Sequence, residues 1–211
     1  MAIIFAAMVS NAQNFQFLYG YGNGEPVNFI TLEIYKPLDG GDFYYFTDFK
    51  LNFGGYFESY TEVSKYWKIG KNGYSVTAQY NMGTFVDDDL AYRINPVYLG
   101  GIQKAVEIDG WIFTFDLLYR YDDYTSQSGV QVTYIYLKEW GNWTLSGYLD
   151  VWNSGVYDPE QTATVAVFEP QLFYSFTKRW SVGVEARVSN YTLALPYKDY
   201  IMGGLKWNLE N

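Results

Sequence analysis

The chain contains neither cysteine nor histidine in its 211 residues. Without cysteine it has no disulfide, thiolate metal site or thiol nucleophile. Without histidine it lacks the Ser-His-acid arrangement of acyl hydrolases. Paired carboxylates of the kind that hydrolyse glycosides remain chemically possible, but acids interspersed with bases are better explained as ion pairs. The sequence therefore predicts a protein that is not an enzyme, with no catalytic residue, cofactor or bound metal.

Long hydrophobic runs are also missing after the first residues, and charged residues make up only 18% of the chain at a mean hydropathy of -0.17. No stretch of about 20 apolar residues offers a membrane-spanning helix. A transmembrane β-barrel stays possible, because its lipid-facing and lumen-facing residues alternate and cancel in any average. Basic residues are few: 14 Lys and Arg stand against 23 Asp and Glu. This balance argues against nucleic acid as a partner.

Aromatic residues, in contrast, are plentiful, with 23 Tyr, 15 Phe and 7 Trp in 211 residues. They fall into a period-two pattern, which is typical of β-strands with two different faces. Residues 28–53 show it clearly, with Ile30, Leu32 and Ile34 on one face and Glu33 on the other. The same pattern, bounded by Gly, Asn, Asp and Pro, predicts twelve strands and no helix: 14–20, 28–36, 42–53, 56–69, 73–82, 95–108, 111–121, 129–139, 142–152, 164–177, 180–190 and 198–209.

The connections between these strands are sorted by length. Those after the second, fourth, sixth, eighth and tenth strands are tight, and the "DG" at 109–110 is a hairpin signal. Most of the others are longer, including an expected loop through 83–93 and another through 153–163. Short turns at one end, long loops at the other and an even strand number are typical of outer-membrane barrels. The fold class is therefore all-β, a transmembrane antiparallel up-and-down β-barrel of about twelve strands over residues 13–211.

The first residues have a different character. Ala2 to Val9 form an apolar run, and Ser10 and Ala12 place small residues where a secretory peptidase cleaves. We therefore expect residues 1–12 to be the remnant of a secretory signal. Such a protein would be located in the outer membrane of a Gram-negative bacterium, with the acidic loops around 87–89, 122–123 and 158–160 at the cell surface.

In a membrane, a sheet can cross only by closing on itself, so its outer face must be apolar and its charged face must point into a lumen. Tryptophans near the turns are expected to form an interfacial girdle: Trp67, Trp111, Trp140, Trp143, Trp180 and Trp207. The inward positions are the candidate substrate contacts: Glu33, Tyr35, Tyr44, Phe46, Asp48, Lys50, Glu58, Tyr60, Glu62, Asp116, Arg120, Tyr148, Asp150, Trp152, Glu169, Glu185 and Arg187, with Lys206 on the same face.

This inward set supports two interpretations. Opposite charges pair across neighbouring strands of a narrow barrel and partly fill it. Alternatively, the side chains line a hydrated, weakly cation-preferring pore. Aromatic faces suit a nucleobase, and carboxylates accept hydrogen bonds from hydroxyl groups.

Several sequence segments resemble those of the Tsx-like outer-membrane proteins, the family of the nucleoside-specific channel and its shorter relatives. They are "NFITLEIYKPLDGGDFYYFTDFKLNFGG", "YTEVSKYWKIGKNGYSVTAQYNMG", "NPVYLGGIQKAV", "FTFDLLYRYDDY", "WTLSGYLDVWN" and "FEPQLFYSF". The resemblance extends over nearly the whole mature chain. It implies a twelve-stranded monomeric barrel in the outer-membrane lipid bilayer, through which nucleosides or similar small polar solutes diffuse passively.

Two functions remain open from the sequence. The first is this diffusion channel. The second is a structural or interaction barrel whose lumen is plugged by its own ion pairs and whose surface loops bind a partner. A porin for acidic oligosaccharides would require a lumen lined by Lys and Arg, and the excess of acids argues against it.

Overall fold

The computed structural model describes residues 12–22, 25–51, 57–87, 90–123, 125–155, 162–190 and 199–209. These residues form twelve strands: β1 Ala12–Gly22, β2 Glu25–Leu38, β3 Gly41–Leu51, β4 Phe57–Ile69, β5 Tyr74–Asp87, β6 Leu90–Ile108, β7 Trp111–Asp122, β8 Gln127–Trp140, β9 Trp143–Gly155, β10 Thr162–Ser175, β11 Trp180–Ser189 and β12 Tyr200–Asn208. Within this described part, no helix is long and apolar enough to cross a membrane.

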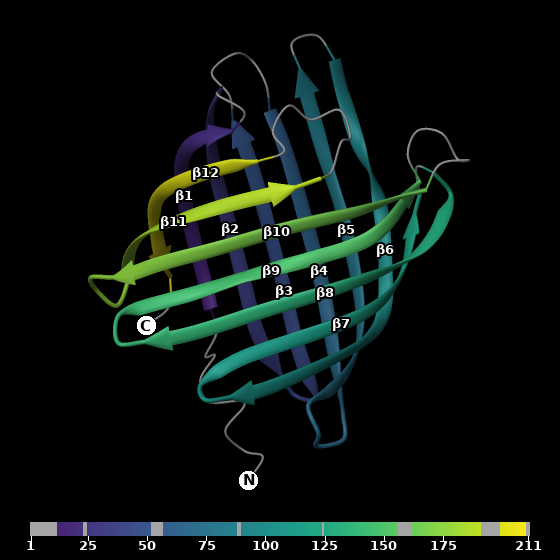
Figure 1. Ribbon diagram of the computed structural model, residues 1–211, viewed down its shortest axis with the longest axis horizontal. Helices are drawn as coiled ribbons and strands as arrows, with labels where there is room; N and C mark the ends of the chain where they lie inside the picture. The colour runs from purple at the N-terminus through teal and green to yellow at the C-terminus, as the bar shows by residue number, and fades with distance from the viewer. Residues whose placement is uncertain are drawn as a thin grey trace.

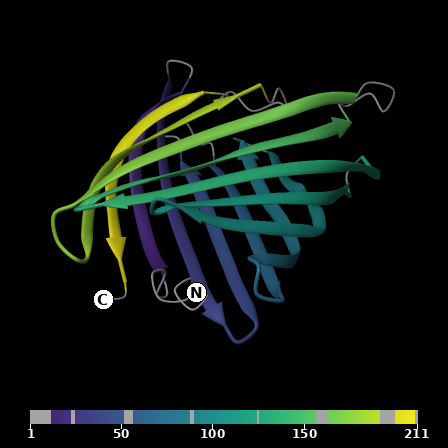
Figure 2. The same ribbon diagram turned by 60° about the horizontal axis from the view of Figure 1, so that its bottom comes forward.

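Every strand pairs with its sequence neighbours in antiparallel order, and β12 pairs with β1 to close the barrel. The closing register sets Asn14 opposite Asn208 and Gly22 opposite Tyr200. Figure 1 shows β7–β11 crossing in front of β2–β5 at a steep angle, and Figure 2 shows the same two walls after a turn. The predicted twelve-stranded antiparallel barrel is confirmed.

Tight turns join the strands at one rim. The turn between β6 and β7 is a two-residue hairpin in which Asp109 has φ 51° and Gly110 has φ 73°. Positive φ at both central positions is the primed geometry that matches strand twist, and Asp-Gly adopts it readily. The four other tight turns occupy residues 39–40, 70–73, 141–142 and 176–179. We call this end of the barrel the turn rim and the opposite end the loop rim.

The long loop expected through 83–93 was a wrong prediction, because β5 continues to Asp87 and β6 already begins at Leu90. Residues 84–86 are β-formers that pair directly with residues 91–93. The glycine and proline that suggested strand ends instead mark an irregularity, where the register shifts between Asn81 and Gly83. Proline has no N–H for the ladder, so Pro96 is tolerated at such a bulge. Asp88, Asp89, Asp158, Glu160 and residues 1–11 lie outside the described residues.

The outward face carries two aromatic rims. All six tryptophans predicted for the girdle lie on this face close to the turn rim, and Trp180 stacks on Trp207 at 5.8 Å between ring centroids. Tyrosines such as Tyr19, Tyr21 and Tyr119 are exposed near the loop rim. From Trp111 to Tyr121 along β7, a rise of about 3.4 Å per residue and a tilt of about 40° give a height of about 26 Å. The apolar band of outer-membrane barrels is about 25 Å tall.

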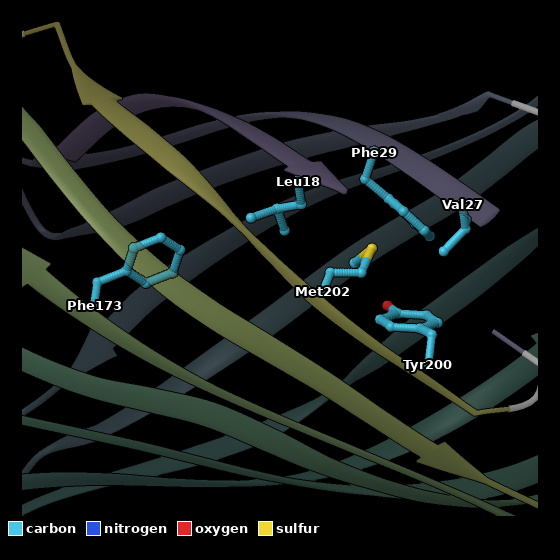
Figure 3. Packing of buried hydrophobic residues seen from close by; sticks show 6 residues of the cluster. All are labelled: Leu18, Val27, Phe29, Phe173, Tyr200 and Met202. Atoms are coloured by element: carbon cyan, nitrogen blue, oxygen red, sulfur yellow. The ribbon is translucent and has the colours of Figure 1, made fainter. Parts of the chain in front are cut away.

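Among the described residues, a cluster of six buried apolar side chains lies inside the barrel, on β1, β2, β10 and β12. Met202 lies among Leu18, Val27, Phe29 and Tyr200 in Figure 3, and the rings of Phe29 and Tyr200 are 5.1 Å apart. This cluster fills the interior beside the seam. The interior is thus partly packed and is polar elsewhere.

Candidate functional site in the barrel interior

The pairing register places the predicted lumen residues on the inward face. Glu33 pairs with Asn14 and Phe46, and Asp150 pairs with Thr133. These cross-strand pairs join buried or half-buried side chains, and along each strand they alternate with the apolar side chains of the outward face. The inward residues are Glu33, Tyr35, Tyr44, Phe46, Asp48, Lys50, Glu58, Tyr60, Glu62, Asp116, Arg120, Tyr148, Asp150, Trp152, Glu169, Glu185, Arg187 and Lys206. Whether a solute contacts them stays a prediction.

One hydrogen-bonded network is centred on Arg187 of β11. Its Nε lies 2.9 Å from Oε2 of Glu169, and its Nη2 donates to the hydroxyl of Tyr148 at 3.2 Å. The hydroxyl of Tyr200 donates to Glu169 at 2.8 Å and lies 3.3 Å from Oε1 of Glu185. Two carboxylates, one guanidinium and two phenols from β9, β10, β11 and β12 therefore meet at one level. We call these five residues the arginine network.

The local backbone explains why the arginine network forms here. Pro170 follows Glu169 in the middle of β10, and proline cannot donate a ladder hydrogen bond. The ladder between β10 and β11 is indeed interrupted, with pairs from Phe168 to Val188 and from Gln171 to Glu185 but none between them. Glu169 and Arg187 occupy this gap. Their side-chain ion pair joins the two strands where the backbone ladder does not.

A second group of charges lies along β2, β3 and β4. Lys50 forms an ion pair with Glu58 at 3.4 Å and lies over the ring of Phe29 at 5.5 Å. Glu33 accepts hydrogen bonds from Asn14 at 2.9 Å and from the hydroxyl of Tyr44 at 3.3 Å. Lys50, Glu58 and Glu33 therefore each have a charged or hydrogen-bonding partner on β1–β4.

An aromatic ladder runs beside these charges. The ring centroids of Tyr44 and Phe46 are 5.9 Å apart, and those of Phe46 and Tyr60 are 5.6 Å apart. The hydroxyl of Tyr60 accepts a hydrogen bond from the side-chain amide of Asn81 at 2.7 Å. Because all three rings are only half-buried, the ladder offers accessible aromatic surface inside the barrel.

The far side of the interior holds a third polar group. Arg120 donates to Gln131 at 2.8 Å and lies over the ring of Trp152, 4.9 Å from its centroid. Gln131 donates to Thr133, whose hydroxyl donates to Asp150. Asp116 is buried nearby. Arg120 is thus held by an amide, by an aromatic face and by an ion pair in which its Nη2 lies 3.9 Å from Oδ2 of Asp122.

Carboxylates from facing walls also come near each other. Asp48 of β3 is close enough to interact electrostatically with Glu169 of β10, and Glu62 of β4 with Asp150 of β9. Arg187 lies within the same range of Asp48. Acids therefore outnumber bases in the space between the walls, and Arg187 is a base within electrostatic range of acids from both walls.

Packing varies along the interior. Ser64 is 0% exposed and Leu118 only 1%, so neighbouring inward side chains cover both of them completely. The side chain of Arg187 is 30% exposed, so the interior is not completely filled at the level of the arginine network. The interior is thus polar over much of its surface, and its side chains are packed closely at some levels and less closely at others.

Sequence reasoning missed the uncharged members of the site. Asn14, Gln16, Asn81 and Gln131 are buried inward-facing amides, and Tyr200 joins two carboxylates. The period-two alternation places the four amides on the inward face, but only charged and aromatic residues were selected as candidates from the sequence. No group of three or more acids in the described residues has the geometry to hold a metal ion.

A closed barrel with an apolar, aromatic outer face and a polar interior defines a β-barrel of the outer-membrane porin type. Two solved structures share this fold. The "KdgM porin in complex with disordered oligogalacturonate" has a TM-score of 0.60 and 10% sequence identity, and the match covers 93% of this chain and 99% of that one. The NanC porin has a TM-score of 0.59 and 9% sequence identity, and the match covers 94% of this chain and 100% of that one. No curated protein sequence matches the chain. The chain belongs to the family described as Domain of unknown function (DUF5020), whose model matches residues 12–208.

Proposed function

We propose that this protein is an outer-membrane channel of a Gram-negative bacterium that lets small polar solutes, nucleosides above all, diffuse passively. One observation carries the proposal: the interior combines an excess of acids with a half-buried aromatic ladder inside a closed barrel. The protein supplies no catalytic group in this function. It acts as a monomeric, selective passage.

The membrane placement rests on the outer face. Apolar side chains on this face are strongly exposed: Val184 is 50%, Leu117 53% and Ile201 65% exposed. In water, such side chains together would form a large and unfavourable apolar surface. In lipid the same surface is stable, and the closed ladder leaves no unpaired sheet edge. The rim of tryptophans matches the interfacial belt of membrane proteins.

The charge preference rests on the excess of acids. Inward acids outnumber inward bases, and Asp48 and Glu62 each face a further carboxylate across the interior. A narrow channel with low-dielectric walls focuses the field of such groups. Cations and neutral solutes should therefore pass more readily than anions. The same excess disfavours acidic sugars, even though the solved KdgM porin holds oligogalacturonate.

Two arguments favour nucleosides among neutral solutes. The first is the resemblance of several sequence segments to those of the Tsx-like channels. The second is the ladder of Tyr44, Phe46 and Tyr60 beside acids that accept hydrogen bonds from ribose hydroxyls. Stacking of a base on an aromatic ring is worth roughly 1–3 kcal/mol in single-strand binding proteins, which is enough to favour a nucleoside over a sugar of equal size.

A second candidate function has its own support. Leu118, Met202 and Phe173 are at most 2% exposed inside the barrel, and the arginine network spans four strands. If these groups close every level, the protein is a structural or interaction barrel whose surface loops bind a partner.

Flux into proteoliposomes tests the nucleoside proposal. Uridine and adenosine should enter faster than a sugar of equal size, and replacing Tyr44, Phe46 or Tyr60 of the aromatic ladder by alanine should reduce this preference. Val132→Ala on the outward face is the matched control and should leave it intact. Equal rates for nucleoside and sugar, unchanged by all three substitutions, would remove nucleoside selectivity and leave a general or plugged barrel.

A further inference from the structure

Lysines of the outward face gather at the turn rim. Lys36, Lys65, Lys104 and Lys138 lie on β2, β4, β6 and β8, each three to five residues before a tight turn. The register places all four on the face that carries the exposed apolar side chains. We call these four residues the lysine girdle.

Two of these lysines are held in the same way. Nζ of Lys104 donates to the carbonyl of Asn72 in the preceding turn and lies 4.0 Å from the ring centroid of Tyr74, the first residue after that turn. Nζ of Lys138 donates to the carbonyl of Asp109 in its preceding turn and lies 5.7 Å from the ring centroid of Trp111, again the first residue after the turn. An ammonium has three N–H donors, so each lysine keeps donor capacity for an outside acceptor.

Charges at the turn rim are sorted by face. The acids near the lysine girdle point inward or lie in the turns themselves: Asp39, Asp42, Glu107, Asp109 and Glu139. At the loop rim, Arg93 is the single outward-facing basic side chain among the residues the structure describes. The outward positive charge is therefore concentrated at one rim, at the level of the tryptophans.

We propose that the lysine girdle binds the phosphate groups of anionic phospholipids in the leaflet that surrounds the turn rim. The inference rests on the membrane placement made above but not on the identity of the solute. Basic residues near an anionic lipid surface attract it by about 1 kcal/mol each. Aromatic rings beside the ammonium groups occupy the headgroup level, and the turn carbonyls fix the ammonium groups there before a lipid arrives.

Tryptophan quenching in vesicles tests this lipid site, because six of the seven tryptophans lie at the turn rim. The full-length barrel is inserted into mixed phosphatidylcholine and phosphatidylglycerol vesicles in which one lipid at a time carries brominated chains. We expect brominated phosphatidylglycerol to quench more strongly at equal mole fraction. The preference should fall about fivefold per lysine in Lys104→Gln and Lys138→Gln, the factor that corresponds to ~1 kcal/mol, and should weaken with salt.

Three controls sharpen the test. Arg93→Gln removes a positive charge at the loop rim and should leave the preference for brominated phosphatidylglycerol unchanged. The double variant Lys104→Arg with Lys138→Arg keeps both charges and should retain the preference. Inorganic phosphate should not abolish it; if phosphate does so, a free-anion site replaces the lipid site. Equal quenching by both lipids in the unmodified protein, or an unchanged preference in both glutamine variants, overturns the lysine proposal alone. Quenching by neither lipid overturns the membrane placement and the lipid site with it.

Discussion

Replacement of Arg187 by methionine removes the only base of the arginine network while keeping most of its volume. Glu169 and Glu185 then keep the hydroxyl of Tyr200 as a shared donor, at 2.8 and 3.3 Å. Breaking a fully buried ion pair costs about 3–5 kcal/mol, and an exposed pair contributes about 0–1 kcal/mol. Arg187 is 30% and Glu169 10% exposed, so we expect a loss of about 2 kcal/mol in the free energy of unfolding.

A double-mutant cycle separates the ion pair from general damage to the barrel. In the Glu169→Gln background, Arg187→Met should cost less than about 1 kcal/mol, because no unpaired carboxylate is left at that position. Unfolding in urea from lipid vesicles, followed by tryptophan emission, measures both values. Lys178→Met, in the exposed turn between β10 and β11, is the control and should change stability by less than about 0.5 kcal/mol. An equal cost of Arg187→Met in both backgrounds would refute the reasoning.

Two further substitutions test the faces and the seam of the barrel. Phe115→Arg places a charge on the exposed outward face and should lower the free energy of unfolding by about 2–4 kcal/mol if that face is lipid-exposed. Asp116→Asn on the inward face should leave a folded barrel. If a heat-modifiability gel shows the same folded fraction for both variants, the assignment of faces is contradicted. Gly204→Val should impair closure of β12 on β1, because a Cβ at Gly204 would lie 1.9 Å from the carbonyl oxygen of Phe17. Gly40→Ala, which meets no atom within 4 Å but has φ +78°, should cost only about 1 kcal/mol, and a similar folded yield for both glycine variants would argue against a tight seam.

Local patterns were enough to predict the fold. Alternation in β7 separates Phe115 and Leu117 from Asp116 and Arg120, and the pairing register places them on opposite faces. The Asp109-Gly110 turn was also identified from its two residues, since the requirement for positive φ is local.

Features that depend on pairing between distant residues were not predictable in the same way. Gly83 suggested the end of a strand, but β5 continues because residues 84–86 find partners on β6. The ladder gap beside Pro170 depends on the register of β11, and so does the meeting of Tyr200 with Glu169. Whether an inward side chain is packed or hydrated depends on the opposite wall, which a single strand does not encode.

Single-channel recording in planar bilayers tests the proposed channel most directly. We expect discrete conductance steps, a reversal potential in a salt gradient that shows weak preference for cations, and loss of that preference near 1 M salt, where the Debye length falls to about 3 Å. Added nucleosides should reduce the current in a saturable way. Arg187→Met should strengthen the cation preference, because it removes one of the few inward bases. A correctly inserted barrel that conducts no ions would contradict the channel and leave the plugged interaction barrel as the function.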